Sequence, residues 1–188
     1  DATELSPVED PVDSGYRLGS GMGSIQPSSD EDYWSFEALA GDVISVSVDT
    51  PGSGLDPHMY LYNAAGSELK YDNNSGPGND AFVSHYTIGS SGTYHVRVGT
   101  WSSSVVGSYE LRLDLARGVQ LESDAEYAND TIAGANVVEL ELSSPGHLGG
   151  TVAATIMSGW DQDVFSLGRL SVGNVVELDV HLPGGSSL

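Results

Sequence analysis

The chain has 188 residues, enough for one large domain or for a domain of about 100 residues followed by part of another. Six lysines and arginines oppose 27 aspartates and glutamates, so the formal net charge is −21. This balance disfavours nucleic acid and anionic membrane surfaces as partners and favours cations, although acidity can also serve solubility alone. The absence of cysteine excludes disulfides, thiolate metal sites and cysteine nucleophiles.

The first residues, Asp1-Ala2-Thr3-Glu4, have neither the basic nor the apolar region of an export signal. The sequence therefore fits a mature chain or an internal fragment. Its many Gly, Ser, Thr, Asn and Asp residues, with one lysine, are typical of bacterial extracellular repeat proteins. No apolar run approaches the roughly 20 residues that span a bilayer. We expect a secreted, extracellular or cell-surface protein without membrane insertion.

Alternating apolar and polar residues predict β-strands along the chain. The pattern is clearest at 43–49 and returns at 94–98, 109–115 and 176–182. Gly, Pro and Asn form turns at 50–54, 63–66, 74–79, 89–92 and 183–185. This pattern predicts an all-β, antiparallel β-sandwich of jelly-roll-like type. The predicted core comprises Trp34, Phe36, Ile44, Val46, Val48, Tyr94, Val96, Val98, Tyr109, Leu111 and Leu113.

An internal repeat predicts the domain organisation. The matching segments, in order, are 23–25 with 150–152, 32–36 with 163–167, 41–44 with 173–176, and 51–52 with 183–184. The predicted parts are an N-terminal extension (1–13), a complete sandwich (14–117), a connector with up to one helical turn (118–134) and an incomplete second copy (135–188).

The second copy contains no counterpart of the segment 58–115. A sandwich without half of its strands would expose a long apolar edge. Two explanations stay open. The chain is a piece of a longer protein, or a neighbouring subunit donates the strands, as in β-augmented fibres. The partner would be the remainder of a longer chain in the first case and another subunit in the second.

Ordered blocks of residues carry a resemblance to a known family. They are 30–36, 40–42, 51–57, 61–62, 72–74, 78–80 and 91–98. Over about residues 14–115 the chain resembles the bacterial pre-peptidase C-terminal domain, and 161–188 resembles the opening of the same domain. The resemblance implies a non-catalytic sandwich found beside catalytic domains of exported enzymes or in tandem in large surface proteins. Related modules of collagenases bind substrate and calcium, which makes both activities hypotheses by analogy.

The best candidate for chemistry is the loop 72–80 with Asp56 on an earlier turn. Calcium takes six to eight oxygen ligands at flexible geometry, and the predicted ligands are Asp56, Asp72, Asn74, Asn79 and Asp80. The loop is not an EF-hand, because no Glu closes it at the twelfth position. The alternative is a polar hairpin turn in which Asn and Asp bond their own backbone.

Paired acidic residues precede a strand in both copies, Asp30 with Asp32 and Asp161 with Asp163. Such pairs act as acid and base in glycoside hydrolysis, but adjacent placement favours strand-end hydrogen bonding, with a secondary calcium role as an alternative. The histidines lack metal-ligand spacing, and no serine lies in Gly-x-Ser-x-Gly. The chain is therefore predicted not to be an enzyme.

Trp101 lies in a predicted hairpin loop. An aromatic ring there either binds extracellular polysaccharide or protein, or closes the end of the sandwich as a lid. The predicted function is a structural or adhesive unit of a secreted or surface bacterial protein. The alternatives are a substrate-targeting module of a secreted enzyme and a filament subunit completed by strand donation.

Overall fold

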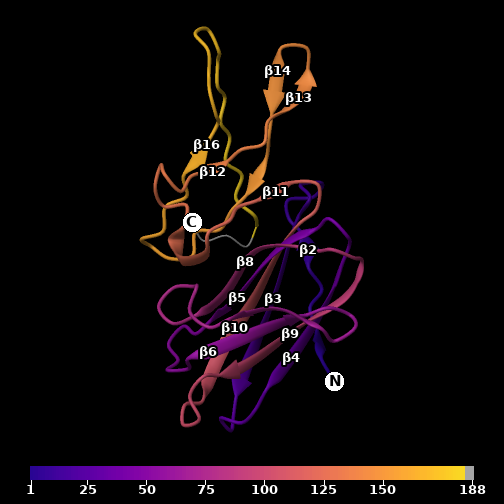
Figure 1. The fold of residues 1–188 in the computed structure, drawn as a ribbon, viewed down its shortest axis with the longest axis vertical. Coiled ribbons are helices and arrows are strands. Elements are labelled where there is room, and N and C mark those ends of the chain that lie inside the picture. The colour runs from indigo at the N-terminus through magenta and orange to yellow at the C-terminus, as the bar shows by residue number, and fades with distance from the viewer. Residues whose placement is uncertain (185–188) are drawn as a thin grey trace.

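The structure is a computed structural model that describes residues 1–184. Two five-stranded sheets form the lower lobe in Figure 1. The first sheet has the order β1 (Thr3–Glu4), β4 (Asp32–Ala38), β9 (Gly92–Thr100), β6 (Pro57–Tyr62) and β7 (Glu68–Asp72). The second has the order β2 (Val8–Glu9), β3 (Tyr16–Ile25), β10 (Gly107–Ala116), β5 (Val43–Asp49) and β8 (Ala81–Thr87). The predicted all-β, antiparallel sandwich is confirmed.

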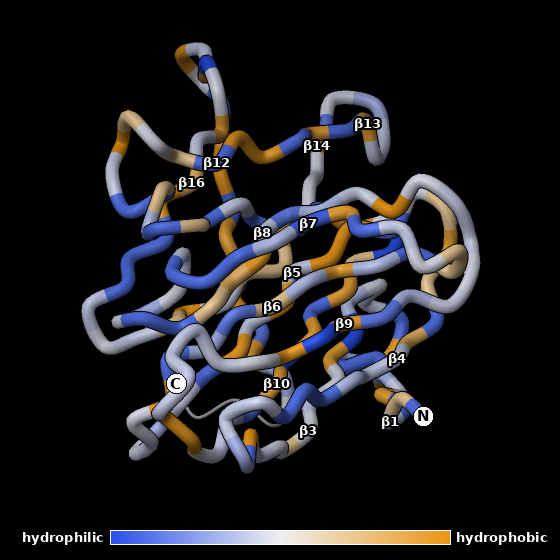
Figure 2. The backbone as a smooth tube through the Cα atoms, turned by 60° about the horizontal axis from the view of Figure 1, so that its bottom comes forward, coloured by the Kyte–Doolittle hydropathy of each residue, from blue (hydrophilic) through white to orange (hydrophobic). Residues whose placement is uncertain are grey.

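The core lies between the two sheets, where alternation places one face of each strand. Ile44, Val46 and Val48 on β5 are each at most 1 % exposed, and every other predicted core residue is also buried. Apolar and polar segments alternate along the strands of the sandwich in Figure 2. Successive side chains of a strand point to opposite faces, so the alternation read from the sequence defines the core directly.

The first 13 residues, predicted as an extension, contribute an edge strand to each sheet. β1 pairs in parallel with β4, and β2 pairs antiparallel with β3. Leu5, between these strands, is buried in the core. The sandwich therefore includes residues near the start of the chain.

The outer face of the second sheet is partly covered by residues that follow it. Ser45 and Ser47, the polar positions of the alternation in 43–49, lie on this face and are 4 % and 8 % exposed. The connector packs there through Leu121, which lies in a small apolar cluster with Tyr16 and Ala116. Arg112 on β10 also donates a hydrogen bond to Thr155 Oγ1 at 2.9 Å.

Residues 118–184 form the upper lobe in Figure 1, made of short strand pairs. The elements are β11 (Gln120–Leu121), η1 (Ala125–Tyr127), β12 (Asn136–Val137), β13 (Glu141–Ser144), β14 (His147–Gly149), β15 (Val152–Ala153) and β16 (Phe165–Ser166). The short turn η1 lies within the predicted connector, but Glu126 and Tyr127 in it have positive φ angles of 59° and 57°, so it is not a regular right-handed helical turn.

The strand predicted at 176–182 is not formed, and Leu178 and Val180 in it are 80 % and 83 % exposed. The corresponding strand of the sandwich, β5, bonds to β8 and β10. Residues 118–184 supply no strand at the equivalents of these two positions. Alternation alone does not form a strand without hydrogen-bonding neighbours.

Candidate functional site

The carboxylates of the predicted calcium loop are engaged in hydrogen bonds that shape the loop. Asp72 Oδ1 accepts hydrogen bonds from the backbone N–H groups of Asn74, Ser75 and Phe82 at 3.1, 3.0 and 2.8 Å. Asp80 Oδ1 accepts a hydrogen bond from Thr50 Oγ1 at 2.6 Å. The bonds from Asn74 and Ser75 are those of a polar Asx-type turn, and the other two tie the loop to β8 and to the turn after β5. Calcium binding at this loop stays a prediction.

The carboxylates before β4 also have structural partners. Asp30 Oδ2 accepts a hydrogen bond from the Gln26 N–H at 3.2 Å. Asp32 Oδ2 accepts one from the Tyr109 hydroxyl at 2.8 Å, and that hydroxyl accepts one from Trp34 Nε1 at 2.8 Å. The second chain of bonds links the rim of the first sheet to the central strand of the second. Both groups serve strand-end hydrogen bonding.

A different set of acidic side chains converges beside the connector. Asp124, just before η1, approaches Asp161 and Asp163, just before β16, so that one carboxylate oxygen of each lies within 4.8 Å of the others. It is the only such group of three among residues 1–184. We call Asp124, Asp161 and Asp163, together with Glu122 and Asn129, the connector cluster.

The connector cluster holds buried oxygen atoms without hydrogen-bond partners. Asp124, Asn129 and Asp161 are 1 %, 0 % and 8 % exposed. Asp124 Oδ2, Asn129 Oδ1 and Asp161 Oδ1 accept no hydrogen bond. Leaving a buried acceptor unpaired costs about 1–3 kcal/mol, and more when it is charged. Carboxylate and amide oxygens are the ligands that Ca²⁺ takes in proteins, so the donor set fits a calcium ion.

The amide of Asn129 is oriented by its neighbours. Its Nδ2 donates to Glu122 Oε2 at 3.3 Å and to Asp163 Oδ1 at 3.4 Å. The Asn129 backbone N–H donates to Asp124 Oδ1 at 3.1 Å. The Nδ2 group of Asn129 therefore has hydrogen-bond acceptors, whereas Oδ1 has no hydrogen-bond donor.

The pKa values of the acidic side chains in the connector cluster are raised, first by burial and then by the neighbouring carboxylates. Burial, opposed by a hydrogen bond from the Asn129 N–H and reinforced by nearby carboxylates, raises the pKa of Asp124 to about 6. Burial and the neighbouring Asp163 also raise the pKa of Glu122. The pKa values of Asp161 and Asp163 are raised, with burial as the largest cause. A bound cation would reverse these shifts, since an opposite charge favours the ionised form.

Sequence reasoning noticed the parts of this cluster but did not assemble them. Asp161 and Asp163 were assigned to a strand end, and 124–130 to the connector. Only the fold brings 122–129 next to 161–163.

A second feature is a row of aromatic side chains on the outer face of the first sheet. Arg97 of β9 lies opposite Tyr33 of β4 and Tyr60 of β6, and Tyr60 lies opposite Tyr71 of β7. The Arg97 Cζ lies 4.1 Å from the Tyr60 ring centre, and the Tyr60 and Tyr71 ring centres are 4.7 Å apart. His58 and Tyr62, two residues before and after Tyr60 on β6, place their rings next to the Tyr60 ring. We call this set the aromatic face: Tyr33, His58, Tyr60, Tyr62 and Tyr71.

Gly99 makes room for one edge of the aromatic face. A Cβ atom at Gly99 would lie 2.7 Å from His58 Nε2, on the facing position of β6. Such an approach is closer than real Cβ atoms allow. Glycine therefore leaves room for the His58 imidazole beside β9.

Trp101 follows β9 and is 65 % exposed. Its backbone N–H donates to the Asp56 carbonyl at 2.8 Å, which ties the loop to the start of β6. With most of its surface exposed, the indole does not close the end of the sandwich, so the lid interpretation does not describe it. Ligand binding through Trp101 stays a prediction.

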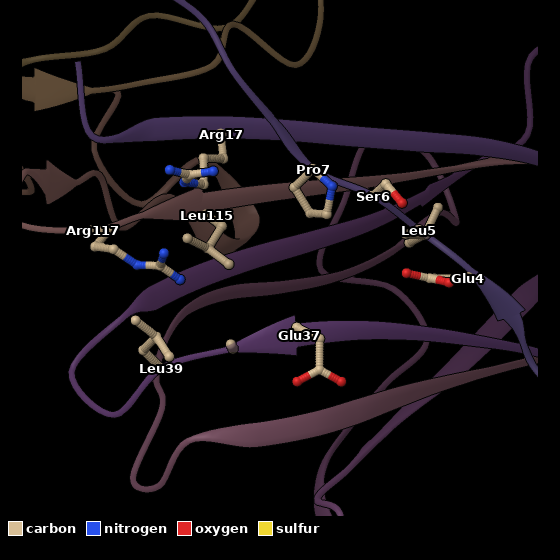
Figure 3. Close-up of a pocket in the computed structure, with 10 residues that line it drawn as sticks. Glu4, Leu5, Ser6, Pro7, Arg17, Glu37, Leu39, Leu115 and Arg117 are labelled. Carbon is tan, nitrogen blue, oxygen red and sulfur yellow. The ribbon is translucent and has the colours of Figure 1, made fainter. Parts of the chain in front are cut away.

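A pocket of about 280 Å³ lies between the N-terminal segment and one end of the sandwich. Figure 3 shows Arg17 and Arg117 beside Leu115 in its lining. Arg17 forms an ion pair with Glu9 at 2.9 Å, and Arg117 bonds Asp42 through two nitrogens at 2.8 Å each. Both charges are already balanced, so the pocket has little attraction for an anion.

Comparison with protein-family models matches residues 30–100 to the bacterial pre-peptidase C-terminal domain. Residues 30–100 are therefore similar to this family. The match runs from just before β4 to the end of β9, and it confirms the resemblance seen in the sequence blocks. The second, partial pre-peptidase C-terminal domain stays a prediction. No curated protein matches the sequence.

Solved structures that resemble part of this chain include a pre-peptidase C-terminal domain of a Bacillus anthracis collagenase. It is 17 % identical with a TM-score of 0.46, and the match covers 60 % of this chain and 94 % of that one. The periplasmic lysozyme inhibitor PliG of Aeromonas hydrophila is 14 % identical with a TM-score of 0.40, covering 62 % and 96 %. PliG of Salmonella Typhimurium is 18 % identical with a TM-score of 0.37, covering 61 % and 99 %.

Proposed function

We propose that this chain is a non-catalytic, extracellular accessory module that binds calcium at the connector cluster. The ion would fix residues 118–184 on the first sandwich. The observation that carries the proposal is the set of unpartnered, buried oxygen atoms of Asp124, Asn129 and Asp161. The pre-peptidase C-terminal domain supports the accessory role. In the described residues, no helix is long and apolar enough to cross a membrane.

The position of Glu122 connects the cluster to the sandwich. Its carboxylate accepts a hydrogen bond from the Thr155 N–H, and the Thr155 hydroxyl accepts one from Arg112 of β10 at 2.9 Å. Arg112 in turn bonds Asp114 at 2.9 Å. A cation that orders the cluster would therefore order the contacts of the upper lobe with the outer face of the second sheet.

Calcium titration of the full chain tests the proposal. After chelator treatment, calcium should bind with one dominant site and raise Tm, because a ligand that binds only the folded state stabilises it. Asp161→Asn should weaken binding roughly tenfold or more, since it removes a charged ligand. Asp30→Asn, at the equivalent position of the first copy, should leave binding unchanged.

Two results would contradict calcium binding at the connector cluster. One is no binding at millimolar calcium. The other is loss of binding in Asp80→Asn with normal binding in Asp161→Asn, which would place the ion at the loop 72–80.

A second candidate function, substrate targeting, is favoured by the aromatic face. Aromatic rings gathered on one face of a sheet suit contact with sugar rings or packing on an extended protein, and Tyr33 and Tyr71 are 43 % and 38 % exposed. Insoluble polysaccharide and fibrillar collagen are the probes. Tyr71→Ala and Trp101→Ala should each reduce retention on the bound polymer, whereas Ile132→Ala, also exposed, should not. Equal retention of all variants would contradict this role.

A further inference from the structure

Strand β8, which ends the strand order of the second sheet, is irregular where it pairs with β5. Ile44 of β5 lies opposite Tyr86, and Val46 lies opposite Val83. Two steps along β5 therefore correspond to three steps along β8. The extra residue on β8 makes a β-bulge at 84–85.

The bulge turns two consecutive side chains of β8 away from the core. Val83 is buried in the core, and Tyr86 packs against the same core. Side chains of a regular strand alternate between faces, so the spacing of three between these residues leaves Ser84 and His85 both outside. Ser45 Oγ holds the bulge by accepting a hydrogen bond from the His85 N–H at 3.0 Å. His85 has a φ of 52°, which is uncommon for a residue other than glycine.

Both side chains of the bulge bond to the backbone of the connector cluster. Ser84 Oγ accepts a hydrogen bond from the Asp124 N–H at 2.9 Å. His85 Nδ1 lies 3.2 Å from the carbonyl oxygen of Glu122. Because a carbonyl oxygen only accepts, the His85 ring is the donor in this bond. The bulge therefore contacts the connector on both sides of residue 123.

A third bond extends this contact to the loop 72–80. The Glu126 N–H donates to the Ser75 carbonyl at 2.9 Å. The N–H of Ser75 in turn donates to Asp72 Oδ1 at 3.0 Å, which fixes the position of that residue. With the two bonds from β8, every second residue of the connector segment 122–126 is bonded to the first sandwich.

The bonds from β8 act on residues that carry candidate calcium ligands. Asp124 has a buried carboxylate oxygen without a partner, and the Glu122 carboxylate accepts a hydrogen bond from Asn129 Nδ2. A site whose backbone is already fixed loses less conformational freedom on binding, which increases affinity. The other acidic ligands, Asp161 and Asp163, come from the second unit. The first sandwich thus supports one side of the cluster.

We propose that Ser84 and His85 are positioning residues of the calcium site at the connector cluster, and that the first sandwich and the ion stabilise each other through them. This inference rests on the calcium binding proposed above. Coupling between two sites is reciprocal. Loss of either side chain should weaken calcium binding although no ligand is removed, and calcium should in turn protect the β8 bulge from hydrogen exchange.

Calcium titration of full-chain variants tests the positioning role. Ser84→Ala should weaken binding by about three- to tenfold, the equivalent of one hydrogen bond. Ser84→Thr keeps the hydroxyl and should bind as the wild-type chain does. His85→Gly, which suits the positive φ, should weaken binding by a similar factor to Ser84→Ala. All three variants should unfold in chelator near the wild-type Tm.

Ser91→Ala is the matched control. Ser91 Oγ accepts a hydrogen bond of the same length, 2.9 Å, from the Ala40 N–H in a turn of the sandwich. Its loss should leave calcium binding unchanged, because this bond does not involve the connector. An equal loss of affinity in Ser84→Ala and Ser91→Ala would indicate general destabilisation and would overturn the positioning role.

Hydrogen exchange gives a readout that a general loss of stability would not produce. Calcium should slow exchange of the Asp124 and His85 amides in the wild-type chain. At saturating calcium, Ser84→Ala should lose the protection of the Asp124 amide, since its acceptor is gone, and Ser84→Thr should restore it.

The outcomes separate this inference from the calcium site itself. Wild-type affinity in both Ser84→Ala and His85→Gly overturns the positioning role and leaves the calcium site in place. A wild-type chain that binds no calcium at millimolar concentration contradicts the calcium site, and the positioning role fails with it.

Discussion

The first sandwich and residues 133–184 share one parallel strand pairing, β1 with β4 and β12 with β16, and one turn, at Asp42 and Asn174, but they differ sharply in burial. Val48 on β5 is fully buried, whereas Val180, its repeat counterpart, is 83 % exposed. β5 has a hydrogen-bonded neighbour on each side, and 175–182 has none in the described structure. The two regions therefore have similar local conformations, but only the first sandwich buries its alternating apolar residues in a core.

This difference shows which part of the fold is local. Turns and short edge pairings form in both regions, because they depend on nearby residues and on positive-φ glycines. Burial of the alternating apolar residues depends on β9 and β10, the last two strands of the sandwich in chain order. β9 is the central strand of the first sheet, and β10 is the central strand of the second. By pairing with strands on both sides, β9 and β10 join the earlier strands into the two sheets of the sandwich.

The largest expected effect comes from equivalent valines. Val48→Ala removes two buried methyl groups and should lower the free energy of unfolding by about 2 kcal/mol, from lost burial and the cavity left behind. Val180→Ala should change it by less than about 0.5 kcal/mol, as exposed substitutions do. Urea unfolding of the full chain measures both. Similar losses would mean that 175–182 is packed in solution.

A smaller effect is expected at the turn before β5. Asp42 accepts two hydrogen bonds from Arg117, each at 2.8 Å, and these outweigh burial to lower the pKa of Asp42. Asp42→Asn copies the residue of the second copy, Asn174. It should cost about 1 kcal/mol, because the charged pair is lost and Arg117 is partly exposed.

Acid provides the check on Asp42. A carboxyl group with a lowered folded pKa stabilises the fold above its unfolded pKa, near 4, and loses that contribution as pH falls through the folded value. The wild-type and Asp42→Asn chains should therefore converge in stability below about pH 4. A constant difference across this range would contradict the assignment.

A third effect, on the pH dependence of stability, is expected at the connector cluster without calcium. The pKa of Asp124 is raised to about 6, and burial raises that of Glu122 too. Such groups are neutral in the fold at low pH, so stability should fall as pH rises from about 4 through the folded pKa values. Glu122→Gln should flatten this dependence in chelator, whereas Glu141→Gln, exposed, should not. A slope unchanged by Glu122→Gln would contradict the raised pKa.

Periodicity in the sequence was sufficient to predict β5, β9, β10 and the core. It could not find β1 or β2, since two residues carry no period. Alternation separates Ser45 and Ser47 from the core residues of β5, but it does not predict their burial, which comes from residues 121–122 and 155–157 packed beside them. The connector cluster could not be predicted because Asp124 and Asp163 meet only in three dimensions. The aromatic face depends on strand register, which alternation does not specify.

Residue-resolved hydrogen exchange of the full chain, with calcium and after chelation, tests the calcium-fixed upper lobe most directly. The account predicts that the amides of 120–130 and 153–166 are protected only with calcium, while those of β5 and β10 are equally protected in both conditions. Equal protection of 120–130 and 153–166 with and without calcium would contradict it.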